Sequence, residues 1–175
     1  MLIGGYPVGI ETKALISYLP ERTYLAPERT PNEMIRFFDD FYEDFDAMKA
    51  YDMLATLRVN PKEKLITMSK GTREKVQLIL VMSRRAQLYM LDEPIGGVDP
   101  AARDYILKTI LSNYNPEGSI LISTHLISDI ESVLDEVIFL REGAGILHKS
   151  VEELKREYNQ SIDEVFREVF KCWGN

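Results

Sequence analysis

Apolar residues gather in short runs along this chain, and stretches with helical spacing separate the runs. Three runs are bounded by turn-forming residues, as is typical of β-strands, and they cover residues 14–20, 88–91 and 119–124. The last two runs are apolar on both faces, and such strands belong in a parallel sheet that is covered on both sides. The pattern therefore predicts an α/β fold.

Helical spacing between the first two runs predicts helices at residues 30–45, 46–57 and 75–85. The first of these helices carries a capping box, because Thr30 stands three residues before Glu33 and Pro31 takes the first helical position. The second is expected to start after Asp46 as its cap. Apolar residues surround the third almost completely, so we expect that helix to be buried.

The second half of the chain is predicted to contain a helix from Asp99 to about Tyr114 and a hairpin at 136–149 with Gly143 and Gly145 in its turn. Two further capping boxes predict C-terminal helices, and they pair Ser150 with Glu153 and Ser161 with Glu164. We interpret residues 1–175 as one domain, with a helical lobe at about 22–85, a sheet core at about 1–21 and 86–149, and C-terminal helices at about 150–173.

Composition limits the classes of function. The 175 residues include 21 basic and 28 acidic ones, for a formal net charge of -7. Nucleic-acid binding depends on clustered Lys and Arg, so this balance argues against a nucleic-acid partner. The single cysteine, Cys172, cannot form an internal disulfide, so we expect a reducing compartment. The sequence contains no apolar run as long as a membrane span and no signal peptide.

A first candidate site follows the strand at 88–91. Asp92 comes directly after this strand, and doubly wound sheets bind ligands beyond that end. A carboxylate there can hold Mg²⁺, and the neighbouring Glu93 could polarise the water that attacks a γ-phosphate. His125 follows the next strand and could contact the same phosphate. Asp92 alone could equally be a polar residue that closes a buried strand. The combination of Asp92 and Glu93 with Gly-Val-Asp at 97–99 and His125 favours a functional site.

A second candidate site lies at the start of the predicted buried helix. Ser69 and Gly71 precede this helix directly, and a hydroxyl with free amides at a helix N-terminus can bind an anion. A plain serine cap explains the same residues, so the segment indicates little by itself. The interpretation as a binding site is supported by the position of this segment, one short helix before the strand that ends at Asp92.

The motifs and their order resemble those of the ATP-binding subunit of an ABC transporter. MSKGT (68–72) stands where the family has its LSGGQ signature, and LYMLDEP (88–94) resembles the Walker B strand with its glutamate. GGVD (96–99) resembles the D-loop, STH (123–125) the switch histidine, and YLPE (18–21) the strand that leads into the Q-loop. The resemblance covers about residues 1 to 149. It implies part of a RecA-like, P-loop NTPase sheet with a small helical lobe.

By this resemblance the activity is that of an ABC-type ATPase that powers transport, and the cofactors are ATP and Mg²⁺. Asp92 would help to bind the metal. Glu93 would act as the catalytic base or water-orienting carboxylate, and His125 would contact the γ-phosphate.

The resemblance also implies a head-to-tail dimer with a second ATP-binding subunit, either identical or different. Ser69 and Gly71 would contact the nucleotide of the opposite subunit, and Asp99 would cross the dimer interface. Residues 22–57 would touch a membrane-spanning transporter subunit. These partners place the chain in the cytoplasm, on the inner face of the cell membrane.

Three positions depart from the family's motifs. Lys70 replaces the first glycine of the signature, Thr72 replaces its glutamine, and Glu21 occupies the glutamine position of the Q-loop. A glutamate there can still bind Mg²⁺ or orient water, although it adds negative charge beside a phosphate. Signatures of this type are similar to those of some bacterial exporter ATPases, so we expect an exporter and do not interpret the departures as inactivating.

The phosphate-binding pattern G-x-x-x-x-G-K-[ST] does not occur in the sequence. Gly4 and Gly9 have the spacing of its two glycines, but Ile10 and Glu11 stand where the lysine and the hydroxyl residue are needed. We therefore interpret residues 4–9 as an ordinary turn between strands. In the family the phosphate loop precedes this region, so we expect a domain without its N-terminal phosphate-binding unit.

Two alternatives remain open. The chain could be a natural short regulatory subunit that offers Ser69 and Gly71 to the ATP of a complete partner. It could instead belong to the DNA-associated ATPases that share the signature and Walker B motifs. Those proteins insert a long coiled coil before the signature, for which residues 46–67 are too short, and the acidic balance also disfavours them.

Overall fold

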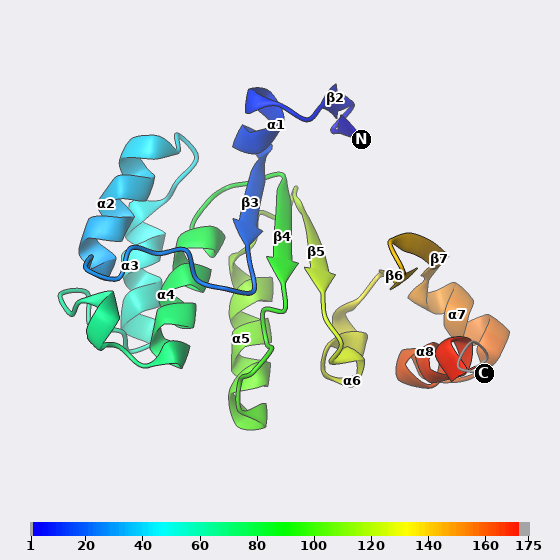
Figure 1. Ribbon diagram of the computed structural model, residues 1–175. Helices are drawn as coiled ribbons and strands as arrows, with labels where there is room; N and C mark the ends of the chain where they lie inside the picture. Colours follow the sequence, from blue (N-terminus) through cyan, green and yellow to red (C-terminus); the bar gives the residue numbers. More distant parts are fainter. Residues whose placement is uncertain (1, 172–175) are drawn as a thin grey trace. The chain divides into compact units, whose positions relative to one another are not determined.

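The computed structural model describes residues 2–171, so Cys172 and the last residues assigned to the C-terminal helix lie outside the described part of the chain. The described residues form two compact units, one up to Thr124 and the other from His125 onward. Figure 1 shows the order of the elements along both units. Within residues 2–171, no helix is both long and apolar enough to cross a membrane.

The first unit is built around a parallel sheet with the strand order β3 (Ile16–Leu19), β4 (Leu88–Asp92), β5 (Ser119–Ser123). The residue pairs of both ladders show that all three strands run in the same direction and end at the same edge. This arrangement confirms the parallel sheet and the α/β fold that the apolar runs predicted.

The other elements of the first unit lie around this sheet. Its helices are α1 (Ile10–Leu15), α2 (Pro31–Phe41), α3 (Ala47–Thr56), α4 (Lys70–Met82) and α5 (Pro100–Asn113). A short antiparallel pair is formed by β1 (Leu2–Ile3) and β2 (Tyr6–Pro7), and a 3₁₀ turn spans Leu65–Thr67.

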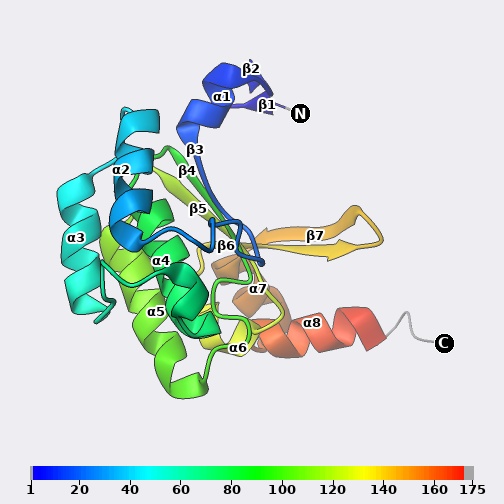
Figure 2. The same ribbon diagram turned by 60° about the vertical axis from the view of Figure 1, so that its left-hand side comes forward.

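One face of the sheet is covered and the other is more open. Figure 2 views the strands nearly edge-on and shows α4 and α5 on the same side of them. Leu19, Tyr89 and Leu91 are buried on one face, while Tyr18 and Leu121 on the other face are 51% and 49% exposed. The core of this unit therefore lies between the sheet and its helices.

Local capping signals set where the lobe helices begin. The capping box of α2 is present as predicted, since Glu33 N–H donates to Thr30 Oγ1 and Thr30 N–H donates to Glu33 Oε2 at 2.8 Å. Asp46 caps α3 by accepting the N–H of Lys49 at 2.9 Å, which also confirms a prediction. Helix α2 ends at Phe41, however, earlier than the predicted residue 45.

The buried helix α4 starts earlier than predicted. It begins at Lys70 rather than at residue 75, because Ser69 takes the capping position and accepts the N–H of Thr72. Gly71 therefore lies inside the first turn of the helix and does not precede it. The second half of α4 is buried on all sides, as its apolar composition predicted.

The first residues fold differently from the predicted turn at 4–9. Only Gly4 and Gly5 form the turn, with φ values of 57° and 85° that favour glycine. Gly9 is already the cap of α1, and its N–H donates to Thr12 Oγ1 at 2.8 Å. Helix α1 was not predicted, because its six residues are too few for a clear helical period.

The second unit contains a hairpin and helices. Its elements are α6 (Ile127–Ile130), a 3₁₀ turn at Glu131–Val133, β6 (Glu136–Arg141), β7 (Ala144–Ser150), α7 (Val151–Tyr158) and α8 (Ile162–Lys171). Glu142 and Gly143 form the hairpin turn, with φ values of 50° and 79°. The prediction of Gly145 in the turn was wrong, because this residue lies inside β7 and pairs with Leu140.

Both predicted C-terminal capping boxes are present. Glu153 N–H donates to Ser150 Oγ and Glu164 N–H to Ser161 Oγ, each at 3.2 Å. These helices supply part of the apolar core of the second unit, whose buried members are Ile127, Val137, Phe139, Val151, Leu154, Ile162 and Val165.

Candidate functional site

The ends of strands β4 and β5 bring two acids and two hydroxyls together. Asp92 is the last residue of β4 and pairs in register with Ser123, the last residue of β5. The hydroxyl of Ser123 donates a short hydrogen bond to Asp92 Oδ1. Because parallel strands end at one edge, this contact follows from the sheet itself. It fixes the first acid at the place where such sheets bind ligands.

Glu93 continues from β4 in a conformation that is uncommon for residues with a side chain. Its φ is +49°, in the left-handed region. Its N–H donates to Ser123 O at 2.9 Å, and its side-chain Oε2 accepts the hydroxyl of Thr124 at 3.2 Å. Both the backbone turn and the carboxylate of Glu93 are thus held by the end of β5.

The turn after Glu93 packs closely against the same side chain. The N–H of Gly96 donates to Glu93 O at 2.9 Å. A Cβ atom at Gly96 would lie 3.1 Å from Glu93 Cβ and 3.3 Å from Glu93 Oε2, closer than side chains normally approach. Gly97 follows at φ +66°. The two glycines therefore permit a tight turn that lies directly against the carboxylate.

The donor atoms at this edge suit a hard cation. Asp92 and Ser123 offer oxygen atoms, which Mg²⁺ prefers, and Mg²⁺ commonly uses only one or two protein carboxylates and keeps several waters. Among the described residues, no group of three or more His, Cys, Asp or Glu side chains converges as a metal cage. The site fits a Mg²⁺ ion that a phosphate ligand also binds.

The signature-like segment lies at the N-terminus of α4. Ser69 accepts the N–H of Thr72 at 3.2 Å, and its Oγ lies 2.8 Å from Thr72 Oγ1, so the ordinary capping role is real. Gly71 is exposed, and a Cβ built there would meet nothing within 4 Å. Glycine inside a helix costs about 1 kcal/mol relative to alanine. Among residues 2–171, no crowding explains why that position is a glycine.

The signature-like and D-loop-like segments approach each other. The ammonium of Lys70 lies 3.8 Å from the Cβ position of Gly97 and 3.6 Å from Glu74 Oε1. Asp99 is exposed and stands immediately before Pro100, the first residue of α5. The start of α4 and the turn before α5 therefore lie side by side.

The two remaining predicted site residues, Glu21 and His125, follow β3 and β5 along the chain. Glu21 is exposed just after β3, where Gln77 of α4 donates to the preceding carbonyl of Pro20 at 3.1 Å. His125 is exposed and opens the second unit, directly after Thr124 in the chain.

Sequence reasoning missed Ser123, Thr124 and Gly96. The strand-end argument that selected Asp92 and Glu93 applies equally to the end of β5, so the two hydroxyls could have been found in that way. The close approach of Gly96 has no such signal, because it depends on how the turn folds back.

Comparisons with known proteins agree with this arrangement. Residues 9–96, half of the chain, match the protein family described as ABC transporter. A solved structure of the ATP-binding subunit of an ABC transporter matches with a TM-score of 0.83 and 26% identity, and covers 97% of this chain and 75% of that chain.

Two curated relatives come from Bacillus subtilis (strain 168). The uncharacterized ABC transporter ATP-binding protein YhaQ is 26% identical over 162 residues, which cover 89% of this chain and 54% of YhaQ. The linearmycin resistance ATP-binding protein LnrL is 27% identical over 152 residues, which cover 82% of this chain and 49% of LnrL. The chain thus spans about half the length of these relatives.

Proposed function

Because the chain belongs to the ABC transporter family of ATP-binding proteins, we propose that it forms part of a subunit that binds and hydrolyses ATP to power transport. The observation that carries this proposal is the pair Asp92 and Glu93 at the end of β4, each hydrogen-bonded by a hydroxyl from the end of β5. Of two carboxylates held at this edge, one can bind a metal while the other orients a water.

The two acids take different roles in this proposal. Asp92 holds Mg²⁺, which neutralises negative charge on the phosphates when it is bound. Glu93 accepts a hydrogen bond from the attacking water and orients it toward the γ-phosphate. His125 contacts that phosphate from the segment after β5. Glu21, which follows β3, would lie near the nucleotide, where it could bind the metal or orient water.

The hydrolytic site is completed by a second ATP-binding subunit. Ser69 and Gly71 face the nucleotide of the opposite subunit, and Asp99 crosses the interface. The exposed glycine in the first turn of α4 supports this role, because no atom of the described residues lies within 4 Å of its Cβ position and a ligand would have room there. The proximity of Lys70 to Gly97 supports a shared surface of these segments.

Residues 22–57 of the helical lobe are the proposed contact with a membrane-spanning subunit. Phe37 and Phe41 of α2 are 56% and 68% exposed and stack with ring centroids 5.9 Å apart. Exposed stacked aromatics of this kind are typical of protein interfaces. The position of the chain would then be peripheral, on the cytoplasmic face of the membrane. The resistance protein among the relatives favours export as the direction of transport.

Hydrolysis by the complex that contains this chain tests the proposal. Glu93→Gln should lower the rate by about 10²- to 10⁴-fold while nucleotide still binds, because the change removes the carboxylate and keeps its shape. His125→Ala should also lower the rate steeply. Glu117→Gln, an exposed site on a turn, is the matched control. Near-normal rates in both site variants would contradict the assignment.

The isolated chain should bind Mg-ATP weakly. The 175 residues contain no G-x-x-x-x-G-K-[ST] pattern, and the segment between Gly4 and Gly9 is occupied by a hairpin turn, a short strand and a helix cap. Calorimetry and phosphate release on residues 1–175 measure this. Micromolar affinity together with steady turnover that Glu93→Gln abolishes would contradict it.

A regulatory half-site is the second candidate function, and the open Ser69–Gly71 segment favours it. The same purified complex separates the two. If the chain only serves the ATP of a partner, Ser69→Arg should lower hydrolysis and Glu93→Gln should not. If the chain performs the chemistry, Glu93→Gln should lower it.

A further inference from the structure

We propose that Thr124 is a positioning residue for Glu93, and that its hydroxyl and the missing side chain of Gly96 together fix the orientation of this carboxylate. The inference rests on the proposed function in one respect, the role of Glu93 in hydrolysis. The contacts that support the positioning are observed among the described residues.

The backbone determines where the side chain of Glu93 starts. Its left-handed conformation at φ +49° is disfavoured for residues with a Cβ atom, so other contacts must maintain it. Its N–H donates to Ser123 O, and its own C=O accepts the N–H of Gly96, both at 2.9 Å. The Cα–Cβ bond therefore has a direction that is set from both sides of the turn.

The carboxylate then has two close neighbours. Thr124 Oγ1 donates to Oε2 at 3.2 Å. The Cβ position of Gly96 is 3.3 Å from the same oxygen, so any larger residue there would crowd the carboxylate. The hydrogen bond and this tight packing together restrict the orientations of the carboxylate.

Two consecutive hydroxyl residues donate hydrogen bonds to two consecutive acids. Ser123 Oγ donates to Asp92, and Thr124 Oγ1 donates to Glu93. Threonine is restricted at χ1 by its second Cβ substituent, so its hydroxyl is better oriented in advance than a serine hydroxyl. A catalytic group must be held within about half an ångström of its working position, and the hydrogen bond from Thr124 contributes to such positioning of Glu93.

Carboxyl NMR of the 175-residue chain tests the inference without requiring hydrolysis. In protein labelled with ¹³C at glutamate, Thr124→Val should move the Cδ resonance of Glu93, which Glu93→Gln identifies. Thr124→Ser should return it close to its original position. The capping-box residues Glu33, Glu153 and Glu164 are internal controls, since they bond elsewhere and should not move.

Two further measurements separate this inference from the role of Glu93. Gly96→Ala should shift the same resonance by a route independent of Thr124. In the hydrolysing complex, Thr124→Val should lower kcat by about 10-fold or more with KM little changed, because misplacement acts on the chemical step. A Glu93 resonance in Thr124→Val that moves no more than the three controls overturns the inference. A shifted resonance with unchanged kcat upholds the positioning and contradicts the proposed role of Glu93.

Discussion

The helical lobe and the carboxyl end of the sheet belong to one unit but differ in their local contacts. In the lobe, α2 and α3 start at well-formed caps, and the buried Arg84 is bonded. Left-handed residues occur in both regions, Arg58 in the lobe and Glu93 at the sheet end, but only Glu93 is packed against a turn in which Gly96 leaves almost no space for a side chain. Strain of this kind is typical of functional sites and is maintained by stable surroundings. The difference indicates that the lobe supplies stability and the strand ends use some of it.

Arg84 shows how the lobe is held to the sheet. Its side chain is almost fully buried, bonds Asp44 through two nitrogens at 2.9 and 3.1 Å, and lies over the ring of Tyr42. It also donates to the carbonyls of Ile16 and Ala14, each at 2.6 Å. The lobe is thereby tied to the start of β3 through one guanidinium group.

The largest expected effect therefore comes from Arg84→Met. It leaves the carboxylate of Asp44 without its partner in a partly buried place, and it leaves two carbonyls unbonded. Loss of one partner of a buried ion pair costs about 3–5 kcal/mol of the free energy of unfolding. Urea denaturation measures it, with the exposed neighbour Arg85→Met as the matched control. Equal stability of the two variants would show that Arg84 does not stabilise the lobe, and would contradict the idea that the lobe supplies stability for the strand ends.

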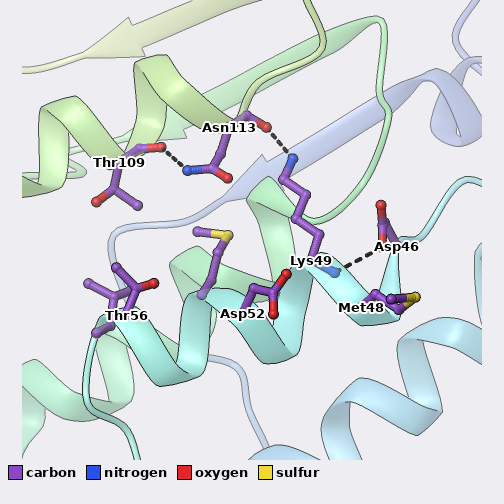
Figure 3. A pocket seen from close by; sticks show the side chains of 9 residues that line it. Asp46, Met48, Lys49, Asp52, Thr56, Thr109 and Asn113 are labelled. Carbon is purple, nitrogen blue, oxygen red and sulfur yellow. Dashed lines mark hydrogen bonds between the residues drawn. The ribbon is translucent and has the colours of Figure 1, made fainter.

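Lys49 is the second tie, and its loss should have a smaller effect. Figure 3 shows its side chain crossing a pocket from α3 toward Asn113. Its ammonium donates to the carbonyl of Asn113 and to that of Met82 at 2.6 Å, the last residues of α5 and α4. Lys49→Met should lower the free energy of unfolding by about 1–3 kcal/mol, because two helix ends lose a charged donor. Lys108→Met, exposed on α5, should change little.

The same side chain gives a pH dependence with a defined sign. Burial lowers the pKa of Lys49, and the nearby Asp46 opposes the shift. A lowered pKa means that charging the buried Lys49 costs some stability. This cost is fully present below the folded pKa and disappears as the pH rises above the unfolded pKa, about 10.4. The wild type should therefore gain stability relative to Lys49→Met as the pH rises through this window. Denaturation curves of both proteins from neutral to alkaline pH would show a constant difference if the burial has no energetic effect.

Sequence patterns predicted the caps of α2 and α3 better than the side-chain contacts at the strand ends, for physical reasons. Thr30, Glu33 and Asp46 are local signals, since each cap bonds residues only three positions away. The early end of α2 depends on a distant contact, because Phe45 pairs with Arg84 in an isolated bridge. The site pairs Asp92 with Ser123 and Glu93 with Thr124 span 31 positions and become visible only when β4 and β5 are aligned.

A third substitution tests whether the caps of the lobe contribute as their geometry indicates. Thr30→Ala should lower the free energy of unfolding by about 1 kcal/mol, because the N–H of Glu33 loses its acceptor. The bond from the N–H of Thr30 is the main cause that lowers the pKa of Glu33. The stability that the ionised Glu33 carboxylate gains from this bond is present at neutral pH and is lost as pH falls through its lowered pKa. Thr56→Ala, exposed at the other end of the lobe helices, is the control and should change little in urea denaturation.

The smallest expected effect has the opposite sign and separates the two regions most clearly. Asparagine tolerates the left-handed conformation better than glutamate, so Glu93→Asn should relieve backbone strain. We expect the free energy of unfolding to rise by about 0.5 kcal/mol, since the relief of strain exceeds the loss of the part-buried hydrogen bond from Thr124.

Glu142 offers the matched control for this prediction, because it has a φ of +50° at the hairpin turn and no proposed part in chemistry. Glu142→Asn creates an Asn-Gly turn, which hairpins favour, and should stabilise the chain without affecting hydrolysis. Glu117→Asn tests a glutamate outside the left-handed region and should give no gain. Thermal and urea denaturation of the three variants would decide. If Glu93→Asn instead lost more than about 1 kcal/mol, Glu93 would be part of what stabilises the sheet end, because strain of about that size would no longer explain its conformation.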